Sequence, residues 1–198
     1  MHKFIAELHN INLTFKNHNV FSDFSLKISN NCITGISGRS GKGKTTLLRI
    51  LAGLQKPDRG EVILRYNKQG YVFQDYRLLP WMNVLENITL PVRGEISESD
   101  AVSRAKLYLG KLGLSGSENM QPAELSGGMA QRVSLARAMV YKPDIMFLDE
   151  PFSALDYEMQ SQASETVRAY AAEHKISVLY VSHHIENLRL MSDTIVEL

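Results

Sequence analysis

The hydrophobic positions of this chain fall into short runs separated by helical patterns, an alternation typical of a sheet flanked by helices. The runs that predict strands are residues 5–8, 11–15, 24–28, 33–36, 61–64, 71–73, 145–148, 178–181 and 194–198. Two of them, 145–148 and 178–181, are apolar at almost every position, which predicts parallel strands buried on both faces. The early runs alternate more strongly, as expected for antiparallel strands with one face toward water.

The middle of the chain, from residue 83 to residue 141, has a wholly helical pattern. Asn83 followed by Glu86 is a capping box, Ser97 with Asp100 is a looser version, and a third helix is predicted to begin at Ser126. We interpret residues 83–142 as a helical signature subdomain inserted into an α/β core made of 1–82 and 143–198. The whole chain is then a single domain.

Composition is that of an ordinary soluble globular domain, with 44% hydrophobic and 22% charged residues among 198. With a formal net charge of +1, no overall electrostatic feature argues for a nucleic-acid partner or an anionic membrane surface, and we expect no nucleic acid among the partners. Cys32 is the only cysteine, so an intrachain disulfide is excluded, which suits a reducing compartment. The first ten residues lack the apolar core of a secretory signal, and no apolar run approaches the roughly 20 residues that span a bilayer. If the protein works at a membrane, we expect another chain to cross it.

Residues 38–45, GRSGKGKT, fit the phosphate-binding pattern G-x-x-x-x-G-K-[ST]. The pattern follows the strand 33–36 and opens a helix predicted over 45–54, the context that this motif requires. We expect Lys44 to reach the β- and γ-phosphates of ATP and the Thr45 hydroxyl to bind Mg²⁺. The residues expected to surround the nucleotide here are Gly38, Arg39, Ser40, Gly41, Lys42, Gly43, Lys44, Thr45 and Thr46, although Lys42 has the alternative of a solvated side chain.

Two carboxylates, Asp149 and Glu150, directly follow the apolar strand 145–148. Ligands bind at the carboxyl ends of strands in α/β sheets, so a rigid buried strand holds these acids at the expected site. We expect Asp149 to act on Mg²⁺, through a metal-bound water, and Glu150 to orient or deprotonate the attacking water.

Residues 125–131, LSGGMAQ, place Ser126 as the cap of a helix whose glycines leave N–H groups facing outward. This is a second anion site, and one nucleotide does not need two phosphate cradles from one chain. Together with the motifs above, the chain resembles the nucleotide-binding subunits of ABC transporters, whose signature begins LSGG. The resemblance implies a dimer, expected to be a homodimer, in which Ser126, Gly127 and Gly128 close over the partner's nucleotide.

Other positions match family landmarks in order. Gln74 matches the glutamine that senses Mg²⁺ and the attacking water, and Asp156, in the sequence SALD, matches a loop that crosses the dimer interface. His183 matches the switch histidine that contacts the γ-phosphate. Phe15 aligns with the aromatic that stacks on adenine, with a core phenylalanine as the alternative. The family usually has Asp where this chain has His184, which makes the hydrogen bonding behind His183 an open question.

The run 75–81, DYRLLPW, resembles the importers of nitrate, sulfonates, taurine and thiamine precursors. In that group this surface receives a helix of the transmembrane permease; the alternative is that Leu79 and Trp81 pack between core and helical lobe. The resemblance implies an ATPase held at the cytoplasmic face of the membrane by permease subunits and served by a solute-binding protein. The stretch 60–70 is short and the chain ends soon after its last core strand, so we expect a trimmed antiparallel subdomain and no regulatory domain.

Three other functions fit the sequence less well. An ABC ATPase of DNA repair or translation usually has tandem units or a long coiled-coil insertion, which the sequence lacks. A P-loop kinase is disfavoured by residues 125–131, and a GTPase by the missing Asn/Thr-Lys-x-Asp motif. A degenerate ATP-binding scaffold is disfavoured because Lys44, Asp149, Glu150 and His183 are all present. We therefore expect an α/β P-loop NTPase core with a mainly parallel sheet, a small antiparallel subdomain and the helical insertion.

Overall fold

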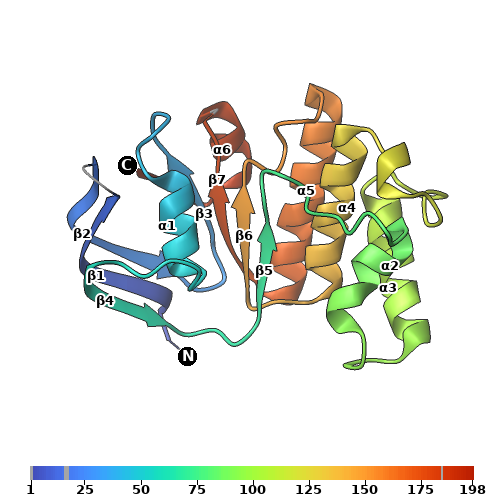
Figure 1. Ribbon diagram of the computed structural model, residues 1–198, viewed down its shortest axis with the longest axis horizontal. Helices are drawn as coiled ribbons and strands as arrows, with labels where there is room; N and C mark the ends of the chain where they lie inside the picture. The colour runs from blue at the N-terminus through green and yellow to red at the C-terminus, as the bar shows by residue number, and fades with distance from the viewer. Residues whose placement is uncertain (1, 16–17, 184) are drawn as a thin grey trace.

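The computed structural model describes residues 2–15, 18–183 and 185–198. Its larger sheet has five strands in the order β5-β6-β7-β3-β8 (Figure 1). All pairings in this sheet are parallel, as the continuous apolar runs predict. The strands are β3 (Ile33–Ser37), β5 (Gln69–Val72), β6 (Ile145–Asp149), β7 (Ser177–Val181) and β8 (Thr194–Glu197).

The smaller sheet is antiparallel, in the order β2-β1-β4. Its strands are β1 (Phe4–Phe15), β2 (His18–Ser29) and β4 (Arg59–Leu64). The prediction of two separate strands over 5–8 and 11–15 was wrong, because both runs belong to β1. An irregularity of register between Leu8 and Ile11, with Asn10 at φ 50°, lets one strand continue where the apolar alternation breaks.

The helices begin where the caps predict. Asn83 and Glu86 form the reciprocal capping box, and Ser97 and Ser126 each accept a backbone N–H at the start of their helices. The helices are α1 (Lys44–Leu51), α2 (Val84–Thr89), η1 (Leu90–Val92), α3 (Glu98–Lys111), η2 (Pro122–Glu124), α4 (Gly127–Val140), α5 (Tyr157–His174) and α6 (Ile185–Met191). Among the residues described, no helix is long and apolar enough to cross a membrane.

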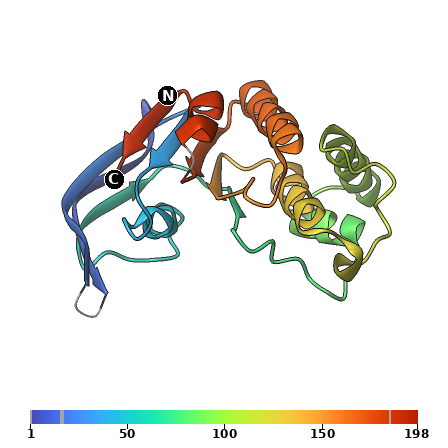
Figure 2. The same ribbon diagram turned by 90° about the horizontal axis from the view of Figure 1, so that it is seen from above.

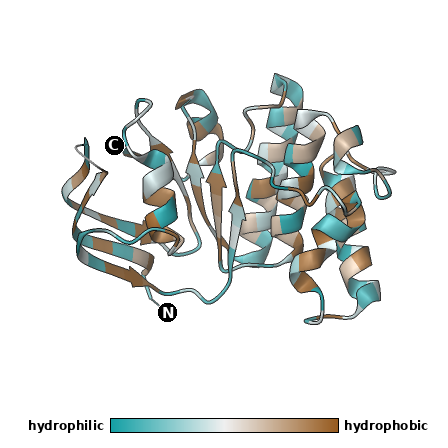
Figure 3. Ribbon diagram, in the orientation of Figure 1, coloured by the Kyte–Doolittle hydropathy of each residue, from teal (hydrophilic) through white to brown (hydrophobic). Residues whose placement is uncertain are grey.

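Two hydrophobic cores share the parallel sheet. One lies between this sheet and the antiparallel sheet and contains α1; the other lies under the helices α2 to α6 (Figures 1 and 2). The buried strands are hydrophobic along their length, whereas polar stretches lie on the outer helices (Figure 3). Each strand of the pair β6 and β7 therefore contributes side chains to both cores. The exact division of the chain at 82/83 and 142/143 stays a prediction.

The sheet brings the motifs to one edge. Because β3, β5, β6 and β7 run parallel, their carboxyl ends lie together. The phosphate loop follows β3 and Gln74 follows β5. Asp149 ends β6 with Glu150 directly after it, and His183 follows β7. This is the edge where open α/β sheets bind ligands.

Candidate active site

A cavity of about 630 Å³ lies at the carboxyl edge of the parallel sheet. Its walls come from the β1–β2 hairpin, the phosphate loop and the ends of β5, β6 and β7. The lining residues are Phe15, His18, Val20, Ser40, Gly41, Gly43, Lys44, Thr45, Thr46, Gln74, Asp149, Glu150, Ser153, Val181 and His183. The cavity therefore unites residues that are far apart in the chain and that the motifs predicted together.

The phosphate loop closes around its own lysine. Lys44 is 9% exposed, and its Nζ donates to the carbonyl oxygens of Gly38 at 2.7 Å and Arg39 at 3.1 Å. Gly43 begins α1 in a left-handed conformation, with φ 87°. Because glycine has no side chain to cap the helix, the first N–H groups of α1 can donate to an anion. The loop thus presents a cation and backbone donors to the same cavity.

Asp149 and Thr45 both line the cavity, and their side-chain oxygens could act together as metal ligands. Asp149 is 4% exposed, and Thr45 Oγ1 donates to its Oδ1 at 3.1 Å. Burial raises the pKa of the Asp149 carboxyl, against the opposing effect of the Thr45 hydrogen bond. A desolvated carboxylate beside a hydroxyl is a donor set that Mg²⁺ prefers, and a bound cation would compensate the buried charge. The residues present therefore fit a magnesium ion.

Glu150 is held in an unusual backbone conformation. Its φ is 51°, in the left-handed region that non-glycine residues rarely adopt, and its N–H donates to the carbonyl oxygen of Val181 at 3.1 Å. Glu150 Oε1 lies 2.9 Å from His183 Nδ1. Backbone strain of this kind is found at functional sites, where the surrounding structure fixes it. The carboxylate at the end of β6 thus has both its backbone and its side chain tied to the end of β7.

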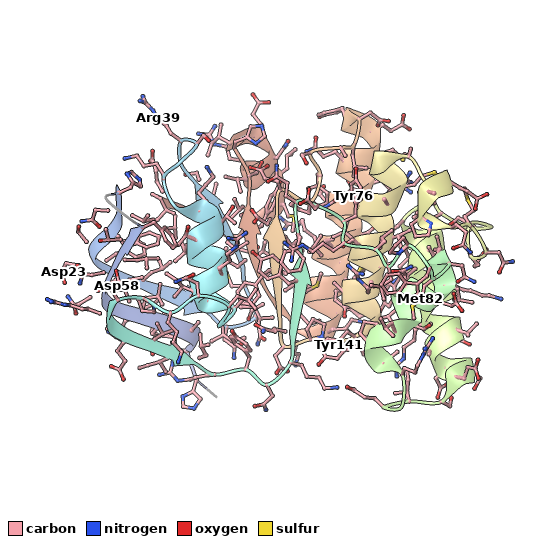
Figure 4. All side chains as sticks on the ribbon, in the orientation of Figure 1. Asp23, Arg39, Asp58, Tyr76, Met82 and Tyr141 are labelled. Atoms are coloured by element: carbon pink, nitrogen blue, oxygen red, sulfur yellow. The ribbon has the colours of Figure 1, made fainter. Side chains whose placement is uncertain are left out.

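Three predicted residues of the phosphate loop, Gly38, Arg39 and Lys42, do not line the cavity. Arg39 points away from the molecule (Figure 4), and Lys42 is exposed, in line with its solvated alternative. Gly38 contributes through the carbonyl that holds Lys44. The prediction about His184 lies outside the described residues.

The signature residues also lie apart from this cavity. Ser126 caps α4 by accepting the N–H of Met129 at 3.2 Å, and Asp156 caps α5 by accepting that of Met159 at 2.9 Å. Ser126, Gly127, Gly128 and Asp156 are absent from the cavity lining. Their predicted contact with a nucleotide therefore requires a second chain, and it stays a prediction.

Phe15 is 45% exposed at the mouth of the cavity, which suits a stacking surface and not a core side chain. Four lining residues were missed from the sequence: His18, Val20, Ser153 and Val181, the last of which was expected only as the end of a strand. Ser153, whose Oγ donates to the Glu150 carbonyl at 3.0 Å, lies in the SALD match and was detectable there. His18 and Val20 reach the cavity only because the β1–β2 hairpin folds over it, and no local motif marks them.

In the segment that follows Gln74, the side chain of Trp81 is exposed to solvent. Trp81 is 71% exposed, so it does not pack between core and helical lobe. Leu79 is half-buried, and its backbone N–H and C=O both bond to the side chain of Asn87 on α2, at 2.7 and 3.1 Å. An exposed tryptophan on a firmly held backbone is what an interface anchor requires.

The combination of phosphate loop, acidic strand end and LSGG cap on one α/β core is that of an ABC-type ATPase. The chain belongs to the ABC transporter family, whose model matches residues 21–153. It is 40% identical over 185 residues to the aliphatic sulfonates import ATP-binding protein SsuB of Frankia casuarinae, covering 93% of this chain and 60% of that protein. SsuB 2 of Nocardia farcinica is also 40% identical over 185 residues, covering 93% of this chain and 75% of that protein.

The fold has a close solved counterpart. The bacterial ABC transporter cassette MJ0796, solved as a dimer, superposes with a TM-score of 0.89 and 31% sequence identity, covering 98% of this chain and 94% of that one. The same cassette has been solved in a post-hydrolysis state bound to ADP and Pi, with the same TM-score. The chain spans less than two thirds of the length of the first sulfonate importer protein.

Proposed function

We propose that this chain binds ATP and hydrolyses it as the ATP-binding subunit of an ABC importer. The observation that carries the proposal is the single cavity that brings Lys44, Asp149, Glu150 and His183 to one edge of the sheet. Relatives named as sulfonate import ATP-binding proteins support the importer class. The proposed solute is accordingly a small one, with sulfonates as the first class to examine.

In this proposal Lys44 leaves the carbonyls of Gly38 and Arg39 to bind the β- and γ-phosphates, and Phe15 stacks on the adenine. Thr45 and Asp149 would hold Mg²⁺, with Gln74, which follows β5, as a further ligand. When bound, the ion neutralises charge on the phosphate oxygens. These side chains keep the nucleotide in one orientation against the end of β6.

Glu150 accepts a hydrogen bond from the attacking water and takes its proton, while His183 contacts the γ-phosphate. Their 2.9 Å contact means that the same imidazole can orient the Glu150 carboxylate. Glu150 and His183 directly follow or lie close to the ends of the adjacent parallel strands β6 and β7, so the register of these strands sets the distance between the two side chains. Hydrolysis therefore depends on a water held between these strand ends and the terminal phosphate.

The proposed assembly is a homodimer on the cytoplasmic face of the membrane, bound to permease subunits and served by a solute-binding protein. The dimeric MJ0796 cassette supports the second copy. Each site would combine Lys44 of one chain with Ser126 and Asp156 of the other, since these lie outside the cavity of their own chain. Trp81 is the proposed anchor for the permease because it is large, amphipathic and exposed.

The test is Glu150→Gln, which keeps size and hydrogen bonding but removes the base. Phosphate release from Mg²⁺-ATP should fall by about 10²-fold or more. ATP affinity, measured by titration calorimetry, should persist, and the variant should accumulate as an ATP-bound dimer in light scattering. Glu165→Gln, at an exposed position of α5, is the matched control and should hydrolyse ATP like the wild type. Near-normal turnover by Glu150→Gln would remove Glu150 from the chemistry.

A further inference from the structure

The backbone between β5 and α2 is held by side chains of the signature helix α4. We call residues 73–83 the bridging segment. Gln131 Nε2 donates to the Phe73 carbonyl oxygen at 3.5 Å. Arg137 donates through Nη2 to the Tyr76 carbonyl oxygen at 3.0 Å and through Nη1 to that of Arg77 at 2.9 Å. These three carbonyls flank Gln74, whose side chain lines the nucleotide cavity.

The hydrogen-bond partners of Arg137 are uncharged backbone carbonyls. Burial lowers the pKa of its guanidinium, and its hydrogen bonds in the described chain go to backbone carbonyls, with no carboxylate among them. Arg137 is half-buried, and its hydrogen bonds to carbonyl oxygens offset part of the cost of removing the cation from water. The guanidinium fork is rigid and planar, so it can fix two consecutive carbonyls in a way that lysine cannot.

Further contacts keep the bridging segment along α4. A Cβ on Gly127 would lie 3.0 Å from Tyr76 Oη, so the side chain of Tyr76 (labelled in Figure 4) reaches the start of α4. The Tyr76 carbonyl oxygen accepts from Arg137, near the end of the same helix. Arg77 has a left-handed φ of 47°, and its guanidinium lies 3.8 Å from the Phe73 ring centroid. This close contact folds the segment back on itself just beyond Gln74.

The other end of the bridging segment is bound to α2. Asn87 is fully buried and, besides bonding Leu79, donates to the carbonyl oxygens of Met82 at 2.8 Å and Asn83 at 3.0 Å. Apart from the bond from Met82 N–H to the Leu79 carbonyl within the segment, the hydrogen bonds described on this backbone come from α2 and α4. A movement of these helices must carry the bridging segment with it, including the backbone on which Gln74 sits.

We propose that Arg137 is a positioning residue that sets the place of Gln74 in the nucleotide cavity by joining the bridging segment to the signature helix. This inference rests on the proposed function, because it assigns Arg137 an effect on hydrolysis. Arg137 touches neither nucleotide nor metal in this scheme. The helix that carries Ser126 at its start and Arg137 near its end then moves Ser126 and Gln74 as one body.

The first measurement is amide hydrogen exchange of the full chain without nucleotide. Arg137→Met keeps the aliphatic stem of the side chain and removes its donors. The Leu79 N–H donates to Asn87 Oδ1 at 2.7 Å, so exchange of this amide should speed up by about 10-fold or more as the bridging segment loosens. Arg137→Lys keeps the charge but loses the fork and should fall between. Arg132→Met is the matched control. Arg132 lies on the same helix and donates to the carbonyl oxygens of Leu112 at 2.9 Å and Gly113 at 3.4 Å, so its loss should leave exchange of the Leu79 amide unchanged.

The second measurement separates positioning from general damage. In Arg137→Met, kcat for ATP hydrolysis should fall by about 10-fold, as for residues that orient a metal ligand, while ATP affinity stays close to that of the wild type because Lys44 and Phe15 are untouched. Thermal melting identifies variants that fail to fold, and Arg137→Lys then provides the comparison.

Each outcome decides something. The role of Arg137 would be overturned by unchanged exchange in Arg137→Met or by an equal effect of Arg132→Met. It would also be overturned if kcat were unchanged in Arg137→Met, or if ATP affinity and kcat fell in parallel. Absence of hydrolysis by the wild type would instead overturn the proposed function, and the catalytic role of Arg137 with it. The exchange experiment needs no nucleotide, so it distinguishes these two failures.

Discussion

Gly43→Ala tests how closely the β1–β2 hairpin packs on the phosphate loop. A Cβ at Gly43 would lie 2.6 Å from Val20 Cγ1 and 3.1 Å from Phe21 Cζ, and the residue would keep a φ of 87°. A left-handed non-glycine residue costs about 1–2 kcal/mol, and overpacking a well-filled site costs about 1–3 kcal/mol. We expect the ligand-free variant to lose about 2–5 kcal/mol of unfolding free energy.

Gly41→Ala separates the two contributions. Gly41 also has a left-handed φ, 80°, but an added Cβ would have no neighbour within 4 Å. This variant should lose only the conformational part, about 1–2 kcal/mol. Both changes stiffen the unfolded chain equally, so that effect cancels in the comparison. Urea unfolding without nucleotide gives the two midpoints. Equal midpoints for the two variants would refute the argument that Val20 and Phe21 crowd Gly43.

Two further predictions concern Phe15 and Asp149. Phe15→Ala should weaken ATP binding by about 10- to 100-fold while Phe15→Tyr preserves it, since base stacking contributes about 1–3 kcal/mol; equal titration curves for wild type and Ala would contradict this. Burial raises the pKa of Asp149 above its usual 3.8, so the folded chain binds this proton more tightly, and the stability it gives is lost as pH rises through the raised pKa. Without nucleotide, Asp149→Asn should therefore melt higher than the wild type at pH 7, with a smaller advantage nearer pH 4. A difference in melting temperature between Asp149→Asn and the wild type that does not change with pH would contradict this prediction.

The sequence predicted those features that neighbouring residues determine. The apolar runs of β6 and β7 require burial on both faces, and the Asn83–Glu86 box is complete within four residues, so both were confirmed. Predicted ends were less accurate: the helix expected to reach residue 54 ends at Leu51. The carbonyl oxygens of Leu48 and Ile50 accept the backbone hydrogen bonds that close the last turn. Gly53, at φ 70°, then takes the chain out of the helical conformation.

Tertiary partners were not predictable in this way. Nothing in the local pattern says that Arg137 meets carbonyls 60 residues earlier, or that Asn87 closes the turn around Leu79 and Met82. These polar groups look like ordinary helix-surface residues until the bridging segment is laid over them. The exposure of Trp81 was likewise left open, because a loop tryptophan serves burial and binding equally well in sequence terms.

The shared sheet has a consequence for how genetic damage should be classified. Along β6 and β7, odd-numbered side chains such as Phe147 and Leu179 enter the core beside α1, and even-numbered ones such as Leu148 and Tyr180 enter the core beneath the helices. Whether a residue of β6 or β7 has an odd or an even number thus determines which of the two cores a substitution there destabilises. In a library of all single substitutions, changes at the odd positions should therefore have effects like those of phosphate-loop variants. Changes at the even positions should have effects like those of variants in the signature helix, although the two sets of positions alternate along each strand.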